Sequence, residues 1–485
     1  MMTTAATNHG LRALAWLSVG VLVAGAFAIA ILPPLRVTVV ALAMLSAIGI
    51  ASLRVANLSM MSRLFVLLYS LPFSASLGYL FDPGFIWARG VNSAPLCQIP
   101  DLINGMLTMA TVGLCGLMAG IEGAAGYMRR FRPAIPVAVP GTADVPTLPL
   151  PVTVLLLLVS IALSWLHAPA KSIFEAAYTG NVETELKGAY LISYLILILL
   201  YVDFERDLHG SLRRRLKLAG LSATVAYIVI VLQFLRGDRE CSGLVAALAM
   251  LCITSPAADA PEAGIGWFSG RMKRALLLAV PLAVCVVAFA ALGTLRRSVT
   301  EPTRYDPDTR SLAVKYFTRN TWTAVSLNNL GLATDYHYDN VEYLHGRTYW
   351  DYVLSLPPSP AAKWFGYVRP MDGPANPSLW YECLMALGGM HPVVVPFRNF
   401  GIWGVLPLLF LSGAFICCCE TLNERGTLSA RLLYGCVATS SMAWFWYGDM
   451  NLIRALMMWA ILLLLYRPGW FRVQRATVPT CRTVS

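Results

Sequence analysis

The sequence predicts an all-α polytopic membrane protein with about twelve transmembrane helices and one large polar cap. Hydrophobic residues make up 57% of the 485-residue chain and charged residues only 13%, whereas a soluble domain has about 25% charged residues. The apolar residues form separate runs that short polar loops divide. One segment, residues 296–399, stays polar and rich in aromatic residues between two of these runs.

The apolar runs set the expected order of the spans, because about 20 apolar residues cross a bilayer. Residues 1–295 are expected to hold spans one to nine with short loops, residues 400–466 spans ten to twelve, and residues 467–485 a tail. The expected spans are 11–33, 37–53, 63–81, 103–127, 152–167, 188–203, 217–235, 243–255, 275–295, 400–419, 432–447 and 451–466.

Basic residues gather in alternate loops, and this pattern orients the chain. The Arg213-Arg214-Arg215 run and Arg467 in the tail are examples. By the positive-inside rule these loops and both termini are cytoplasmic, and segment 296–399 lies outside. The net charge of +11 therefore predicts contact with membrane lipids and no nucleic-acid partner.

The outer segment 296–399 is expected to be a folded cap. It carries sixteen aromatic residues and three of the six histidines, and disordered segments are poor in aromatic residues. Helices are expected at 311–330, 347–356 and 378–387, each followed by glycine or proline. Long ordered loops usually carry function, so we expect the cap to hold half of an active site.

Several arginines lie at the predicted outer ends of spans, against the charge bias of the loops. Arg236 and Arg239 lie in the turn between spans seven and eight, and Arg454 lies inside the last span. Charges within spans usually serve function, and guanidinium groups bind phosphate in bidentate fashion. Arg239 and Arg454 are therefore expected to hold a diphosphate at the outer membrane face. Alternatively, Arg454 snorkels to the headgroups or pairs with Asp449 or Asp238.

The cap supplies candidate general bases. Glu382 lies in the third expected cap helix, and a carboxylate there is suited to accept a proton. His337 and His345 are rival bases, and His391 is a weaker one. The alternative for each histidine is a surface or hydrogen-bonded polar residue, and for Glu382 a charge on the helix surface.

The cap also supplies candidate binding residues. Arg319, Arg347 and Arg398 are candidate phosphate ligands, or else partners of the nine acidic residues of the cap. Tyrosine and tryptophan side chains such as Tyr349 suit the faces of sugars, although they equally suit a hydrophobic core. No Walker loop, Gly-x-Gly-x-x-Gly stretch or zinc-spaced Cys/His set is found, so no cofactor is expected. Cys97 and Cys383 lie in outer loops, either as a disulfide or as two free thiols.

Several stretches and one arginine resemble the Wzy-type O-antigen polymerase family. The stretch Tyr343-Leu-His-Gly-Arg-Thr-Tyr-Trp-Asp-Tyr-Val-Leu-Ser-Leu-Pro357 is similar to its G-x-T-Y…L-P stretch. Trp380-Tyr-Glu-Cys, followed by Phe400-Gly-Ile-Trp-Gly404, resembles its glutamate-containing stretch before the next span. Leu235-Arg-Gly-Asp-Arg239 is similar to its outer G-x-R turn, and Arg454 to its late outer arginine. The resemblance covers about residues 190–466.

The resemblance implies a metal-independent membrane glycosyltransferase of GT-C-like architecture in the bacterial inner membrane, with its active site in the periplasm. Its substrates would be undecaprenyl-diphosphate-linked glycans, which it would join into O-antigen or exopolysaccharide. A chain-length regulator and a flippase are the implied protein partners. The sequence leaves three alternatives open. One is an O-antigen ligase that transfers the glycan to lipid A core. The others, from different classes, are a lipid-linked oligosaccharide flippase or other transporter and a non-catalytic assembly subunit.

Overall fold

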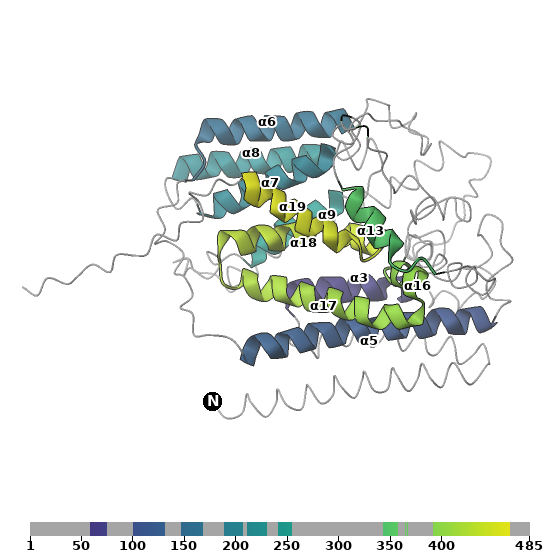
Figure 1. The fold of residues 1–485 in the computed structure, drawn as a ribbon. Coiled ribbons are helices and arrows are strands. Elements are labelled where there is room, and N and C mark those ends of the chain that lie inside the picture. Colours follow the sequence, from purple (N-terminus) through teal and green to yellow (C-terminus); the bar gives the residue numbers. More distant parts are fainter. Residues whose placement is uncertain are drawn as a thin grey trace, which may run out of the picture. The chain divides into compact units, whose positions relative to one another are not determined.

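The structure is a computed structural model, and it describes residues 59–74, 100–130, 147–167, 189–206, 211–229, 241–254, 343–356, 364, 366 and 391–465. Within these ranges every regular element is an α-helix, as the composition predicts (Figure 1). The chain divides into two compact units. One comprises Met1–Phe131, Thr303–Thr421 and Ser440–Arg454, and the other comprises Arg132–Pro302, Leu422–Thr439 and Ala455–Ser485.

Nine of the expected spans overlap with helices in the described ranges. These helices are α3 (Met60–Ser74), α5 (Pro100–Arg130), α6 (Leu150–His167), α7 (Ala189–Arg206), α8 (Ser211–Val229), α9 (Cys241–Ile253), α17 (Ile402–Asn423), α18 (Leu428–Tyr447) and α19 (Asn451–Leu465). By length and composition two of them can cross a membrane, through Met109–Met128 of α5 and through Ile402–Asn423. Four others are apolar but shorter. The expected spans 11–33, 37–53 and 275–295 lie outside the described residues.

In the first unit, α5 and α17 approach so closely that their contact needs glycine. A Cβ atom on Gly120 of α5 would lie 2.0 Å from the carbonyl oxygen of Phe410, and one on Gly116 would lie 2.6 Å from that of Leu406. From the other side, a Cβ on Gly413 of α17 would lie 2.1 Å from the carbonyl oxygen of Leu117. Small residues that let two backbones touch are typical of helix pairs in membranes.

The start of α3 is held by a carboxylate from the end of α17. Glu420, only 5% exposed, accepts hydrogen bonds from the backbone N–H groups of Met61 (2.9 Å) and Ser62 (3.2 Å) and from the Ser59 hydroxyl. The first N–H groups of a helix lack partners within the helix, and its N-terminus favours negative charge. Glu420 satisfies both requirements and fixes α3 to α17.

The second unit contains a buried ion pair between neighbouring helices. The Lys217 ammonium of α8 donates to Asp203 of α7 at 2.9 Å, and both side chains are 2% exposed. Asp203 also accepts from the backbone N–H of Leu148, just before α6, at 2.9 Å. One carboxylate therefore joins three helices of this unit.

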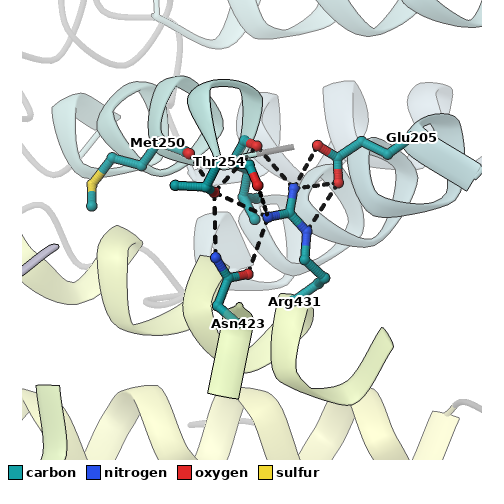
Figure 2. Close-up of polar contacts among 6 residues, drawn as sticks. Glu205, Met250, Thr254, Asn423 and Arg431 are labelled. Atoms are coloured by element: carbon teal, nitrogen blue, oxygen red, sulfur yellow. Dashed lines mark hydrogen bonds and ion pairs between the residues drawn. The ribbon is translucent and has the colours of Figure 1, made fainter. Parts of the chain in front are cut away.

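Arg431, near the start of α18, is the centre of the most extensive polar network in the described residues of this unit (Figure 2). Its guanidinium donates to both carboxylate oxygens of Glu205 at the end of α7 and to Asn423 at the end of α17. It also donates to the carbonyl oxygens of Leu251 (2.8 Å) and Thr254 (3.2 Å) at the end of α9. These carbonyls lack partners within the helix. A single arginine near the start of α18 therefore satisfies the end of α9 and links it to the ends of α7 and α17.

The described part of the cap contains two short helices, α13 (Arg347–Leu354) and α16 (Val394–Phe400). The first confirms the helix expected at 347–356, although it ends two residues earlier. Helix α16 was not predicted, because its seven residues include Pro396 and run directly into Gly401 and the next apolar run. The helices expected at 311–330 and 378–387 lie outside the described residues.

Candidate functional site

The candidate site is the junction, within the first unit, of α13, α16 and the turn between α18 and α19. The chain before α13 pairs with the end of α16, since the N–H of Leu344 donates to the carbonyl of Arg398 (3.2 Å) and that of His345 to the carbonyl of Asn399 (2.9 Å). Two stretches of the cap that are about fifty residues apart are therefore joined through their backbones.

Two glycines allow this pairing. Gly346, the residue before α13, has φ 86°, and Gly401, the residue after α16, has φ 62°. Residues other than glycine rarely adopt these backbone angles. A Cβ on Gly401 would also lie 2.7 Å from the Tyr343 hydroxyl oxygen. Gly346 and Gly401 thus allow the stretch 343–357 to contact the stretch 400–404.

Asn399 fixes the first turn of α13 from inside. It is fully buried, its side-chain oxygen accepts from the backbone N–H of Thr348 at 3.2 Å, and its side-chain amide donates to the carbonyl of Val395 at 2.9 Å. The ring of Phe400 stacks on that of Tyr349, with an angle of 17° between the ring planes. Helix α13 therefore has a defined orientation on α16.

Two tyrosines of α13 bond to the α18–α19 turn. The Tyr349 hydroxyl donates to the Asp449 carboxylate, at 3.0 Å and 2.8 Å from its two oxygens. The Tyr352 hydroxyl donates to the side-chain oxygen of Asn451 at 3.1 Å, and the Asn451 amide donates to the carbonyl of Gly448 at 3.0 Å. Helix α13 is thus attached at two points to the turn from which α19, the helix of Arg454, begins.

The electrostatics of this junction are unusual because Asp449 is buried. Only 6% of the residue is exposed. Burial raises the pKa of its carboxyl to about 7, and hydrogen bonds from Tyr349 and from the backbone N–H groups of Asp449 and Met450 offset only part of this effect. Burial and the neighbouring Asp449 also raise the pKa of Tyr349. A carboxyl group that changes charge near neutral pH is typical of functional sites.

His391 is a structural residue rather than an available base. It is completely buried, its Nε2 lies 3.0 Å from the carbonyl oxygen of Tyr69, and its Nδ1 accepts from the N–H of Val393. These contacts require the neutral ring with its proton on Nε2. Burial lowers the pKa of His391 to about 4, which keeps the ring neutral at physiological pH.

Five of the predicted site residues lie in this part of the first unit. Tyr349 is in the junction itself, Arg347 is exposed at the start of α13 and pairs with Asp351 at 3.3 Å, and His345 is exposed beside it. Arg398 on α16 and Arg454 on α19 are both half-buried. The other candidates lie outside the described residues, as do both cysteines of the expected disulfide; they are Glu382, His337, Arg236, Arg239, Arg319, Cys97 and Cys383.

The sequence analysis missed four polar residues that build the junction, namely Asp449, Asn451, Tyr352 and Asn399. Asp449 was considered only as a partner of Arg454. One signal was present, because Gly448-Asp-Met-Asn451 is a polar turn between two apolar runs. Nothing local links that turn to tyrosines that precede it by about a hundred residues. Among the described residues no group of three or more His, Cys, Asp or Glu side chains is arranged to hold a metal ion.

No family model matches the chain, and neither the curated proteins nor the solved structures include one that is similar to it. What the fold defines is an all-helical protein in its described residues, with apolar helices and a polar junction at one set of helix ends.

Proposed function

We propose that this chain is a membrane glycosyltransferase that joins undecaprenyl-diphosphate-linked oligosaccharide repeats into O-antigen or exopolysaccharide at the periplasmic face of the bacterial inner membrane. The observation that carries the proposal is the meeting of family-like stretches in one unit. Tyr343 of the first stretch lies against Gly401 of the second. The first stretch also bonds, through Tyr349, to Asp449 in the turn that leads to Arg454. Residues that matter to one reaction must come together in this way.

The proposed topology of twelve spans has independent support from the polar contacts. Three contacts at helix ends join ends that the positive-inside rule assigns to one side. Arg431 and Glu205 both flank predicted cytoplasmic loops, and Glu420 meets the predicted cytoplasmic end of α3. Tyr349 of the outer cap meets Asp449 in a predicted outer turn. A misassigned span would have reversed the sides of the ends that follow it.

A bilayer also accounts for the outward face of α6. Leu155 and Leu158 are 59% and 57% exposed, and Val152, Val154 and Val159 accompany them. Soluble proteins rarely expose a continuous apolar patch of this kind. Lipid chains are a suitable neighbour for this face, whereas water is not.

In the proposed reaction, an acceptor sugar hydroxyl attacks the anomeric carbon of the donor sugar, and the bond from that carbon to the diphosphate oxygen breaks. The leaving undecaprenyl diphosphate takes the electron pair, and arginine guanidinium groups stabilise its charge. Arg454 and Arg398 are the half-buried candidates for this role in the described region, and Arg239 is their counterpart outside it. A general base accepts the hydroxyl proton, and Glu382, His337 and His345 remain the candidates for it.

The test is chain growth by the purified full-length protein in detergent. The reaction contains undecaprenyl-diphosphate-linked repeats, with and without lipid A core as a second acceptor. Longer lipid-linked chains without core support the polymerase. Transfer only when core is present would identify a ligase instead. If the protein forms no glycosidic bond under either condition but moves labelled substrate across a vesicle membrane, the flippase alternative replaces both.

A further inference from the structure

The polarity of helix α13 is the reverse of that expected for a helix on a water-facing surface. Its buried face carries Thr348, Asp351 and, just past its end, Ser355, which are 1%, 7% and 7% exposed. Its exposed face carries Trp350 and Val353, which are 63% and 39% exposed. A helix beside water normally buries its apolar side chains and exposes its polar ones. The exposed face of α13 therefore fits an apolar neighbour better than water.

The hydrogen bonds of the junction fix which face of α13 points outward. The two tyrosines of the helix bond to the α18–α19 turn, and the backbone N–H of Thr348 donates to Asn399 of α16. A rotation of the helix that buried Trp350 would break all of these bonds. The outward position of the apolar side chains is therefore part of the fold.

The exposed face of α13 also carries a positive charge. Arg347 lies one turn before Trp350, on the same side of the helix, and its side chain is 63% exposed although its Nε donates to Asp351 at 3.3 Å. Asp351 is the one acidic residue between positions 343 and 356, and it is buried. An exposed face that combines arginine with tryptophan and aliphatic side chains is typical of helices that lie in the headgroup region of a membrane.

The depth of α13 in a membrane follows from its contact with the start of α17. The 22 residues of α17 rise about 33 Å, close to the thickness of a bilayer core of about 30 Å. Its first turn, which exposes Trp403, is then at the boundary of that core. Phe400, just before this turn, stacks on Tyr349, and a Cβ on Gly346 would lie 3.1 Å from its ring. Helix α13 is thus at the same end of α17 (Figure 1), at the level of the headgroups.

We propose that the exposed face of α13 is a lipid-binding surface that rests in the headgroup region of the outer leaflet. Trp350 and Val353 contact the upper acyl chains, and Arg347 binds the phosphates of anionic headgroups. This inference rests on the proposed membrane topology. It adds to the proposed function that the cap is seated on the membrane at the depth of the diphosphate of the donor lipid.

The experiment is fluorine NMR of the full-length protein labelled with 5-fluorotryptophan, in nanodiscs of phosphatidylethanolamine and phosphatidylglycerol. Trp350→Phe assigns the Trp350 resonance through its loss, and Trp350→Tyr gives a second assignment. Trp403→Phe and Trp444→Phe assign two reference signals. Each signal is recorded with a phosphatidylcholine that carries a doxyl group near the top of its acyl chain, and separately with a gadolinium chelate in the water. We expect the doxyl lipid to broaden the Trp350 signal beyond detection and the chelate to leave most of it.

The two reference tryptophans give each result a definite meaning. Trp403 should respond as Trp350 does, and Trp444, which is fully buried, should respond least to both agents. A Trp350 signal that the chelate broadens more than the doxyl lipid faces water, and one that neither agent broadens is covered by protein; either result overturns the inference. If the doxyl lipid broadens Trp403 but not Trp350, only the inference fails. If it broadens neither, the proposed topology fails as well.

A second arm of the experiment tests the role of Arg347. Doxyl-labelled phosphatidylglycerol should broaden the Trp350 signal up to about five-fold more than doxyl-labelled phosphatidylcholine, because one arginine near an anionic surface enriches anionic lipid by about this factor. Arg347→Gln should remove the difference, and Arg215→Gln, which changes an exposed arginine of the second unit, should keep it. Equal broadening in the wild type, or a difference that survives in Arg347→Gln, would overturn the assignment of Arg347 to anionic headgroups. None of these outcomes depends on chain growth, so a protein that shows them but forms no polymer contradicts the proposed function alone.

Discussion

Replacing Arg431 by methionine should strongly destabilise the second unit. Methionine has a similar length and suits an apolar site, so the change removes hydrogen bonds and charge with little change in volume. It leaves the buried Glu205 carboxylate without its guanidinium partner. It also leaves the Leu251 and Thr254 carbonyls at the end of α9 without their donors.

The size of the effect follows from these losses. Arg431 and Glu205 have side chains that are 4% and 9% exposed, so the pair is screened little by solvent. Removal of one partner from a buried pair costs about 3–5 kcal/mol, because the other charge stays behind. For a unit of about 200 residues, 4 kcal/mol corresponds to a melting midpoint about 8–16 °C lower.

The assay is thermal unfolding of the purified protein in detergent, with Arg215→Met as the control. Arg215 is an exposed residue of the same unit, and its replacement should change the midpoint little. The double variant Glu205→Gln, Arg431→Met removes both charges and should recover about 1–3 kcal/mol relative to the sum of the two single effects. If Arg431→Met melts within a degree of the control, or if the double variant shows no recovery, the network does not hold the helix ends as reasoned.

Four further predictions concern other parts of the chain. Gly120→Leu should separate α5 from α17 and lower the amount of folded protein in membranes, whereas Gly126→Leu, which meets open space, should not; a detergent-soluble yield equal for both would contradict the close contact. The pKa of His391 is about 4 in the folded protein and near 6.5 in the unfolded chain. The free energy of unfolding should therefore fall by about 3 kcal/mol as the pH falls from 6.5 to 4. His391→Gln should weaken this pH dependence in melting curves. Arg454→Lys keeps the charge but loses the guanidinium fork, so chain growth should fall by about 30- to 1000-fold, with Arg215→Lys as the control on gels at matched protein level. Reporter fusions at residues 350 and 480 should lie on opposite sides of the membrane. A signal from the same side for both fusions would contradict the proposed topology.

Much of the described fold could be predicted because it depends on local sequence. An apolar run forms a helix wherever its backbone groups must be satisfied within the segment, so the bounds of α6 (Leu150–His167) and α19 (Asn451–Leu465) nearly match the expected spans 152–167 and 451–466. Helix α13 was predictable for a similar reason, since Pro357-Pro358 limits it from behind. The short helix α16 was not, because nothing in seven residues distinguishes it from the start of the following span.

The candidate site was predicted only in part. Arg347, Arg398 and Tyr349 were identified as individual residues by their chemistry, and the structure gathers them around one junction. The same reasoning made His391 a weaker candidate for the general base, and the structure buries it completely, which lowers its pKa to about 4. The sequence cannot distinguish a histidine that donates a hydrogen bond to the backbone from one that accepts a substrate proton. Only the surroundings of the ring in the folded protein distinguish these roles.

What the sequence by itself determined is the helical nature of the described elements, because the apolar runs that form them are properties of composition and order along the chain. The alternation of basic loops predicts a membrane topology. The tertiary structure alone decided the partners. Asp449 lies 100 residues after the tyrosine that donates to it, and Arg431 lies 226 residues after Glu205. The burial that raises the pKa of Asp449 comes from elements on both sides of it in the chain, so no local pattern could reveal it. The charge and polarity of a side chain follow from its residue type, but the free energy of a buried group depends on the groups that surround it.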